Sequence, residues 1–269
     1  MKALEQRTLG QTGIRVSCVG LGTVKIGRNF GVKYPENFEI PDNNQVQRLL
    51  EAASELGINL LDTAPAYGES EERLGQLLCN RDQWVLCTKV GEEFDQGVSS
   101  FDFSSSHVRS SIERSLKRLR TDYIDIALIH SDGNDKEIIS NTDCFEALQK
   151  LKDAGLIKAF GMSTKTVAGG IEAIKLSDVV MVTYNPLYGE DGLIIDEAKK
   201  FNKGVLIKKG LSSGHLKSLT GDDSNSVKDS LEFIFKKSGV SSVVVGTINL
   251  DHLRENVKTT IEVLDKKHK

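Results

Sequence analysis

The chain has 269 residues, of which 39% are hydrophobic and 27% are charged, a composition that excludes disorder as its main state. Its 35 Lys and Arg residues against 38 Asp and Glu residues give a net charge of −3, so no positive field is available to attract nucleic acid. Cys18, Cys79, Cys87 and Cys144 are spaced too widely for a CxxC pair or a dense disulfide framework. Since no apolar run approaches the length of a membrane helix, we expect a cytoplasmic protein without membrane or nucleic-acid partners.

The chain opens with a predicted β-hairpin, in which residues 7–10 and 14–17 pair across a turn at residues 11–13. Short apolar segments then alternate with longer segments of helical periodicity. The predicted strands are residues 18–23, 59–62, 84–89, 124–130, 157–162, 179–182, 205–208 and 242–246. The predicted helices are residues 45–56, 70–78, 106–119, 143–154, 166–174, 195–201, 227–237 and 251–264.

Residues that are favoured at helix ends support the predicted helix boundaries. Ser106 and Asp143 precede periodic segments and are predicted N-caps, whereas Gly57 and Gly155 follow the last helical turn, where a left-handed residue is favoured. Residues 222–226, which are all Asp, Ser or Asn, are interpreted as a surface loop within one domain.

Eight strand–helix units in succession predict an α/β fold, a single (β/α)8 TIM barrel over residues 1–269 with a short N-terminal β-hairpin. The strands at 124–129 and 243–245 are nearly continuous apolar runs, which parallel strands buried on both faces require. The competing doubly wound dinucleotide fold needs a GxGxxG turn after its first strand, and the glycines of residues 20–27 do not have that spacing.

Polar residues that end neighbouring strands are the candidates for catalysis, because barrel active sites lie at the carboxyl ends of the strands. Asp62, Lys89 and His130 end the second, third and fourth predicted strands, and Tyr67 lies in the loop after Asp62. Asp62 is expected to hold Lys89 protonated. An ammonium group about 4 Å from a phenol, at an effective dielectric of about 20, favours the phenolate by about 4 kcal/mol, so we expect Lys89 to lower the pKa of Tyr67.

This arrangement suits Tyr67 as the acid that protonates a carbonyl oxygen, with a neutral His130 orienting that oxygen. Since side chains do not donate hydride, the carbon must receive it from a nicotinamide cofactor bound without the usual glycine-rich loop. No metal is expected.

The sequence resembles the aldo-keto reductase superfamily over nearly its whole length. Residues 61–68, LDTAPAYG, are similar to the D-T-A-x-x-Y-G segment of that family, and Thr88-Lys89 and Ile129-His130 resemble its strand-three lysine and strand-four histidine. Residues 161–164, 184–187 and 246–256 are similar to its G-x-S-N turn, its Y-N-x-L segment and its C-terminal nucleotide-binding stretch. The resemblance implies a catalytic tetrad of Asp62, Tyr67, Lys89 and His130.

The resemblance also implies the cofactor contacts and a small-molecule carbonyl or alcohol substrate. NADP(H) is the expected cofactor ahead of NAD(H), but His252 stands where an arginine often binds the 2′-phosphate, which leaves the preference open, with Arg254 nearby. Met181 and Thr164 replace amide side chains usual in the family, and the seventh strand lacks the usual aromatic residue. The implied contacts are Gly22, Thr23, Ser163, Thr164, Lys208, Lys209, Gly210, Leu211, Gly246, Thr247, Asn249 and Asn256, with Ser163 and Thr164 at the carboxamide and Lys208 or Lys209 at the pyrophosphate.

The sequence therefore predicts an NAD(P)H-dependent oxidoreductase that reduces an aldehyde or ketone or catalyses the reverse oxidation. Three alternatives stay open. The first is a sugar dehydrogenase that works oxidatively, and the second is a non-catalytic nicotinamide-binding sensor subunit. The third is a lyase that uses Lys89 as a Schiff-base nucleophile, which would require a desolvated lysine without a neighbouring carboxylate. The sequence does not reveal the physiological substrate or the oligomeric state.

Overall fold

A closed barrel of eight parallel strands forms the centre of the protein in the computed structural model, which describes residues 3–32, 34, 37–212 and 223–267. The strand order around the barrel is β10-β11-β12-β3-β4-β5-β8-β9, so each strand pairs with the next barrel strand along the chain and the last pairs with the first. This confirms the predicted (β/α)8 fold. The strands are β3 (Val19–Gly22), β4 (Leu60–Asp62), β5 (Val85–Val90), β8 (Ile124–His130), β9 (Ile157–Ser163), β10 (Val179–Thr183), β11 (Gly204–Lys208) and β12 (Ser242–Val245).

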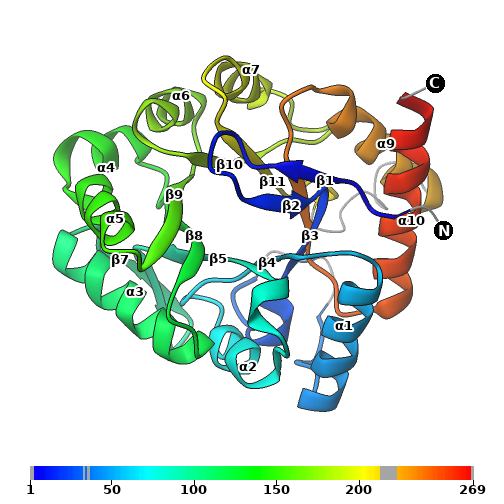
Figure 1. The fold of residues 1–269 in the computed structure, drawn as a ribbon, viewed down its shortest axis with the longest axis horizontal. Helices are drawn as coiled ribbons and strands as arrows, with labels where there is room; N and C mark the ends of the chain where they lie inside the picture. Colours follow the sequence, from blue (N-terminus) through cyan, green and yellow to red (C-terminus); the bar gives the residue numbers. More distant parts are fainter. Residues whose placement is uncertain (1–2, 33, 35–36, 213–222, 268–269) are drawn as a thin grey trace.

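Helices surround the barrel as an outer ring (Figure 1). Each predicted helix is present, with ends that differ by a few residues from the sequence pattern. The helices are α1 (Asn43–Glu55), α2 (Ser70–Leu77), α3 (Ser105–Leu119), α4 (Asp135–Asn141), α5 (Cys144–Asp153), α6 (Val167–Leu176), α7 (Gly192–Lys200), α9 (Asp223–Lys236) and α10 (Leu250–Lys267), with short 3-10 turns η1 (Val24–Ile26) and η2 (Arg81–Gln83).

Local chemistry explains several helix ends. Asp42 begins α1 with a capping box, in which its carboxylate accepts from the Gln45 backbone N–H while the Gln45 side chain accepts from the Asp42 N–H. Gly57 and Gly155 have φ of +82° and +76°, the predicted left-handed conformation after α1 and α5. The N-cap of α3 is Ser104, not the predicted Ser106, because Ser104 Oγ accepts from the His107 N–H. Asp143 precedes α5 as predicted, but its carboxylate accepts from the Ser105 N–H.

The predicted N-terminal hairpin is present as β1 (Gln6–Thr8) and β2 (Arg15–Ser17), drawn in dark blue across the middle of Figure 1. Leu9 and Val16 are fully buried and pack with residues of the barrel interior, such as Leu60 and Val179. Because these contacts lie near the beginnings of the strands, the hairpin closes the amino end of the barrel. The site described below lies at the opposite end.

Three features differ from the sequence prediction. A second hairpin, β6 (Glu92–Asp95) and β7 (Val98–Phe101), follows β5, and α4 follows β8. The predicted surface loop at residues 222–226 is wrong from Asp223 onward, since α9 begins there, and residue 222 lies outside the described residues. A polar run of this kind predicts a loop, but Asp and Ser are also favoured where a helix begins.

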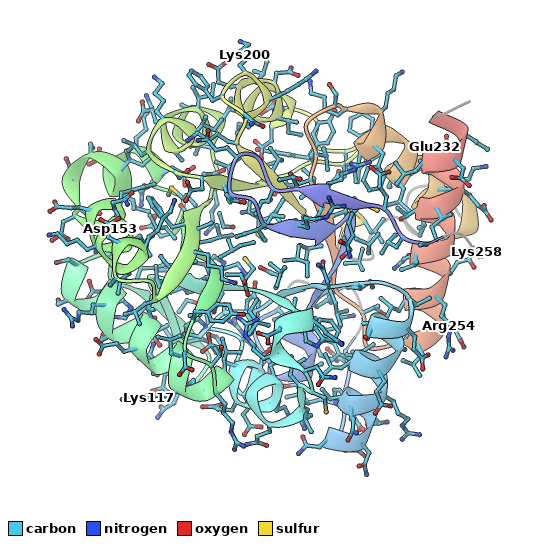
Figure 2. All side chains as sticks on the ribbon, viewed as in Figure 1. Lys117, Asp153, Lys200, Glu232, Arg254 and Lys258 are labelled. Carbon is cyan, nitrogen blue, oxygen red and sulfur yellow. The ribbon has the colours of Figure 1, made fainter. Side chains whose placement is uncertain are left out.

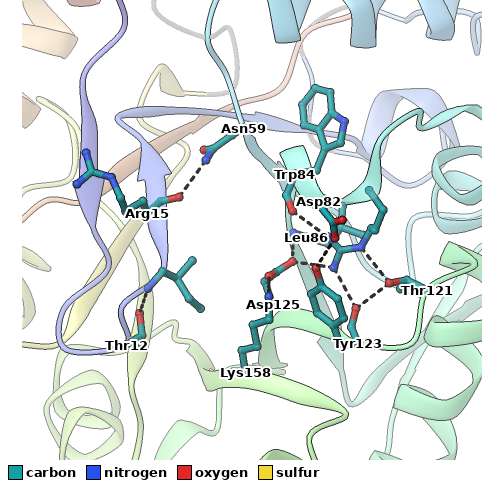
Figure 3. A network of polar contacts seen from close by, with 12 residues as sticks. Thr12, Arg15, Asn59, Asp82, Trp84, Leu86, Thr121, Tyr123, Asp125 and Lys158 are labelled. Atoms are coloured by element: carbon teal, nitrogen blue, oxygen red, sulfur yellow. Dashed lines mark hydrogen bonds and ion pairs between the residues drawn. The ribbon is translucent and has the colours of Figure 1, made fainter.

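A polar network joins three strands near the closed end of the barrel (Figure 3). Asp125 on β8 accepts hydrogen bonds from Arg81 Nη2 at 2.7 Å and from the Leu86 N–H of β5 at 3.0 Å. Its other oxygen accepts from Lys158 Nζ of β9 at 3.0 Å. The buried carboxylate is therefore matched by two cations and a backbone donor.

The outer faces of the helices carry the solvated charges. Examples at the periphery of Figure 2 are Lys117, Asp153, Lys200, Glu232, Arg254 and Lys258. Among the described residues, no helix combines the length and the apolar character needed to cross a membrane.

Candidate active site

A buried ion pair lies at the carboxyl ends of β4 and β5. Lys89 Nζ donates to Asp62 Oδ1 at 2.7 Å and to the Thr63 carbonyl at 2.9 Å, and both residues are at most 5% exposed. Burial alone lowers the pKa of Lys89, but the carboxylate of Asp62 and the neighbouring Tyr67 outweigh burial and raise that pKa above its usual value. Lys89 is therefore held as an ammonium ion, as expected.

Tyr67 lies above this pair in the loop between β4 and α2. Lys89 Nζ is 4.8 Å from the centre of the Tyr67 ring. Burial of the hydroxyl raises the pKa of Tyr67 above 10, although the charge and hydrogen bond of Lys89 act in the opposite direction. The expected lowering of this pKa is wrong, because that argument weighed the attraction of the ammonium group and left out the desolvation of the phenolate. Tyr67 thus keeps its proton at neutral pH, ready to donate it.

His130, at the end of β8, is the second polar group beside Tyr67. The two rings meet edge to face, with centroids 6.2 Å apart. Burial lowers the pKa of His130, and the positive charge of Lys89 adds to this effect, so the imidazole is neutral at neutral pH as expected. The structure therefore brings all four residues of the predicted tetrad together at one mouth of the barrel.

Glu92, which the sequence reasoning missed, contacts His130 from the hairpin β6–β7. Its Oε2 lies 2.7 Å from His130 Nδ1, although the direction of the ring nitrogen departs from that of an ideal hydrogen bond. Burial raises the pKa of Glu92, but His130, Ser99 and Arg28 together lower it to about 2. One sequence signal was available: Gln96-Gly97 is a hairpin turn pair, with φ of +46° and +88°, that begins six residues beyond the end of β5.

Ser163, Thr164 and Lys208 form a second cluster in the same mouth. Lys208 Nζ, at the end of β11, donates to Ser163 Oγ at 2.9 Å and to the Thr164 carbonyl at 2.7 Å. His130 and Ser163 are register partners on β8 and β9, so this cluster adjoins the tetrad. Thr164 Oγ1 is buried and has no hydrogen-bond partner among the described residues, so a polar group of a bound molecule fits there.

Burial lowers the pKa of Lys208 to about 7, and the positive charges of Lys209 and Lys89 contribute to this shift. The neighbouring Lys209 is exposed and has a left-handed backbone with φ of +54°. The structure thus separates the two lysines that the sequence treated together, since Lys208 faces into the mouth and Lys209 faces solvent.

The glycines at the ends of β3 and β12 lie beside each other, because Leu21 pairs with Val245. A Cβ on Gly22 would lie 3.6 Å from the Cα of Gly246, and a Cβ on Gly246 would lie 2.8 Å from the Tyr34 hydroxyl. Val244 Cγ1 also lies 3.1 Å from the position of a Cβ on Gly22, so at both positions neighbouring protein groups already fill the space that a side chain would take. Thr23, which follows Gly22, has a positioning role: its hydroxyl donates to the Asp62 carbonyl at 2.9 Å and helps to position that residue.

The start of α10 carries the remaining predicted contacts. Asn249 Oδ1 accepts from the N–H groups of Asp251 and His252, at 2.8 and 3.1 Å, and so begins the helix. Thr247 and Asn256 are almost buried. Asn249 therefore pairs with two N–H groups of the first turn of α10, close in the chain to the predicted contacts Thr247 and Asn256.

Gly210 and Leu211 follow β11, and the structure gives Gly210 a packing role. A Cβ on Gly210 would lie 2.8 Å from Val243 Cγ1 and 3.0 Å from Ile234 Cδ1, so β12 and α9 leave little space for a side chain. Met181, which replaces an amide residue usual in the resembled family, is buried within the barrel interior.

The described residues contain no cluster of three or more His, Cys, Asp or Glu side chains arranged to hold a metal ion. Beside the tetrad they offer the unpartnered Thr164 hydroxyl, a buried polar group that fits the carboxamide of a nicotinamide ring.

Comparisons with known proteins show the family and the fold. The model of the aldo/keto reductase family matches residues 19–229. A provisionally assigned aldo-keto reductase from Pseudomonas aeruginosa superposes with a TM-score of 0.87 at 47% identity, covering 96% of both chains. The aldo-keto reductase AKR11C1 from Bacillus halodurans, in its holo form, has the same fold, with a TM-score of 0.80 at 24% identity over 98% of this chain and 96% of that one.

L-galactose dehydrogenase from Arabidopsis thaliana is 30% identical over 98% of this chain and 90% of its own length. The family match covers most of the chain, from β3 at the start of the barrel into α9, and includes all four tetrad positions. The chain belongs to the aldo/keto reductase family of oxidoreductases, whose members use nicotinamide cofactors.

Proposed function

We propose that this oxidoreductase interconverts a small aldehyde or ketone and its alcohol with NADP(H), and that Tyr67 is the general acid and base. The observation that carries the proposal is the buried Lys89–Asp62 pair directly beneath Tyr67. A buried ammonium ion beside a tyrosine is the arrangement needed to stabilise the phenolate that remains after the proton has left.

In the reductive direction, the carbonyl oxygen of the substrate lies between the Tyr67 hydroxyl and the His130 ring. The bound nicotinamide supplies hydride to the carbonyl carbon. Negative charge develops on the oxygen, and Tyr67 Oη transfers its proton to it. Lys89 stabilises the resulting phenolate, and Asp62 keeps Lys89 charged and in position. In the oxidative direction, the phenolate accepts the proton of the alcohol.

The cofactor contacts remain part of this proposal. Ser163 and Thr164 are assigned to the nicotinamide end, supported by the unpartnered Thr164 hydroxyl. Lys208, which the sequence prediction placed at the pyrophosphate as an alternative to Lys209, is assigned to the same end because it donates hydrogen bonds to Ser163 and Thr164. Gly22, Gly246, Thr247, Asn249 and Asn256 are assigned to the phosphates and ribose, as the family resemblance implies. NADP(H) is proposed ahead of NAD(H) because Arg254 on the exposed side of α10 offers a guanidinium group to a 2′-phosphate.

The lyase alternative fits this geometry poorly. A Schiff-base nucleophile must be a neutral amine, but Lys89 is ion-paired at 2.7 Å to Asp62 and its pKa is raised. Lys89 therefore acts on Tyr67 through its charge.

The test uses purified protein with a panel of aldehydes, ketones and alcohols, and follows nicotinamide absorbance with NADPH and NADH in parallel. Tyr67→Phe removes the transferred proton and leaves the ring, so we expect kcat to fall at least about a hundredfold while cofactor affinity is kept. If the wild type binds cofactor but turns over nothing in either direction, the sensor alternative replaces this proposal. If Tyr67→Phe retains full activity, another group is the acid.

A further inference from the structure

The cluster of Lys208, Ser163 and Thr164 places a cation in the mouth of the barrel beside the tetrad. Lys208 Nζ lies 2.9 Å from Ser163 Oγ, and Ser163 is paired in register with His130. Ser163 therefore connects Lys208 on β11 to the strand that pairs with β8 at His130. Tyr67 and Lys89 do not need Lys208 for proton transfer, so its presence calls for another explanation.

The position of the hydride donor follows from the tetrad. When Tyr67 and His130 hold the carbonyl oxygen of the substrate, the carbonyl carbon is also fixed within the mouth. Hydride transfer requires the nicotinamide ring to be in van der Waals contact with that carbon. Asp62, Lys89 and His130 end β4, β5 and β8, and the strands that face these three across the barrel are β10, β11 and β12. We infer that the nicotinamide ring lies on that facing side. Lys208 at the end of β11 borders that space.

The two redox states of the nicotinamide ring differ in charge, because the oxidised ring is a cation and the reduced ring is neutral. We propose that Lys208 makes the site discriminate between them, so that the protein binds the reduced cofactor more tightly than the oxidised cofactor. This inference rests on the proposed function. Two unit charges about 6 Å apart, at an effective dielectric of about 20, repel enough to change an equilibrium constant about a hundredfold.

The discrimination is sensitive to pH. Burial and neighbouring cations lower the pKa of Lys208 to about 7, so Lys208 is charged below this pH and neutral above it. The affinity for the oxidised cofactor therefore rises as the pH rises through 7. The affinity for the reduced cofactor does not change when Lys208 loses its proton, because the reduced ring is neutral. The charged and titratable groups that act on Lys208 are Lys209 beside it, Lys89 on β5, His130 on β8, Asp135 on α4 and Asp191 before α7.

The phosphates of the cofactor also respond to charge and pH, but they are the same in both redox states. The ratio of the two dissociation constants, oxidised over reduced, therefore isolates the effect at the ring. The experiment measures both constants by isothermal titration calorimetry, at least one pH unit below and above the Lys208 pKa of about 7. It needs no substrate and no turnover.

For the wild type we expect the ratio to fall at least tenfold from the lower to the higher pH. Lys208→Met, which keeps the length of the chain and removes the charge, lowers the ratio at the acidic pH at least tenfold and makes it independent of pH. Lys208→Arg keeps a charge that does not titrate, so it retains the preference at both pH values. Lys175→Met, on the exposed side of α6, behaves as the wild type.

A wild-type ratio that is the same at both pH values and unchanged in Lys208→Met overturns this inference and leaves the proposed function intact. If neither redox state binds the wild type at all, the proposed function falls and this inference falls with it. If the wild type binds the oxidised cofactor more tightly at the acidic pH, the proposed sign is wrong and the inference is overturned.

Discussion

Glu92 illustrates how one carboxylate governs the chemistry of a neighbouring ring. Its Oε2 is 2.7 Å from His130 Nδ1, while Ser99 Oγ donates to its other oxygen at 2.7 Å. The negative charge of Glu92 favours a proton on the Nδ1 atom that faces it, which leaves Nε2 of the neutral ring as the acceptor nitrogen. The pKa of Glu92 is lowered to about 2, so its contribution to stability is complete above the pKa of an unfolded Glu and is lost as the pH falls toward 2.

Glu92→Gln should lower kcat/KM about tenfold, because the imidazole loses the charge that orients it. The carboxylate raises the pKa of His130, so that pKa should fall further in the variant. The dependence of kcat/KM on pH measures both effects. Glu93→Gln, the next residue on β6, is the matched control, since Glu93 pairs with Arg114 and His107 instead. Wild-type kinetics in Glu92→Gln would show that the contact with His130 has no role in orientation.

The sequence could predict the tetrad because strand ends in a parallel barrel meet at one edge, so Asp62, Lys89 and His130 had to converge. It could not predict the pKa of Tyr67, which depends on how much solvent the folded loop removes from the hydroxyl. Glu92 was missed for a similar reason, because its partner is 38 positions away along the chain and the hairpin that brings them together has only four residues in each strand.

Among the elements, α1 shows a stability contribution that can be tested apart from function. Asp42→Ala removes the carboxylate that caps the Gln45 N–H, at 2.8 Å, and with it half of the capping box. We expect the free energy of unfolding to fall by about 1 kcal/mol. Urea denaturation followed by circular dichroism measures this change. Asn44→Ala, one position inside the exposed first turn, should be nearly neutral, and an equal loss in both variants would exclude a capping effect.

The eight barrel strands were predictable as elements because each is a short apolar run between turn residues, as parallel strands buried on both faces require. The hairpin β6–β7 was harder to predict, since β7 is exposed along its whole length and so lacks the alternation of apolar and polar residues that a half-buried strand shows. Helix α4 was missed because its seven residues, DKEIISN, are too few for a helical period to stand out.

At the scale of the whole molecule, Asp125 links three barrel strands at the end remote from the active site. Asp125→Ala leaves Arg81 and Lys158 without their shared carboxylate and the Leu86 N–H without its acceptor. We expect the free energy of unfolding to fall by about 3 kcal/mol. Chemical denaturation gives the value, and Asp122→Ala on the nearby exposed turn is the control. Unchanged stability would mean that other contacts hold these strands together.

The N-terminal hairpin has a consequence for the traffic of molecules through the barrel. Leu9 and Val16 close the amino end, so under the proposed function both the cofactor and the substrate enter from the carboxyl end. Two molecules that use one entrance bind in a fixed order, and the molecule that lies deeper binds first and leaves last. With the cofactor as the deeper molecule, its release ends each turnover, and its rate of release sets an upper limit on kcat.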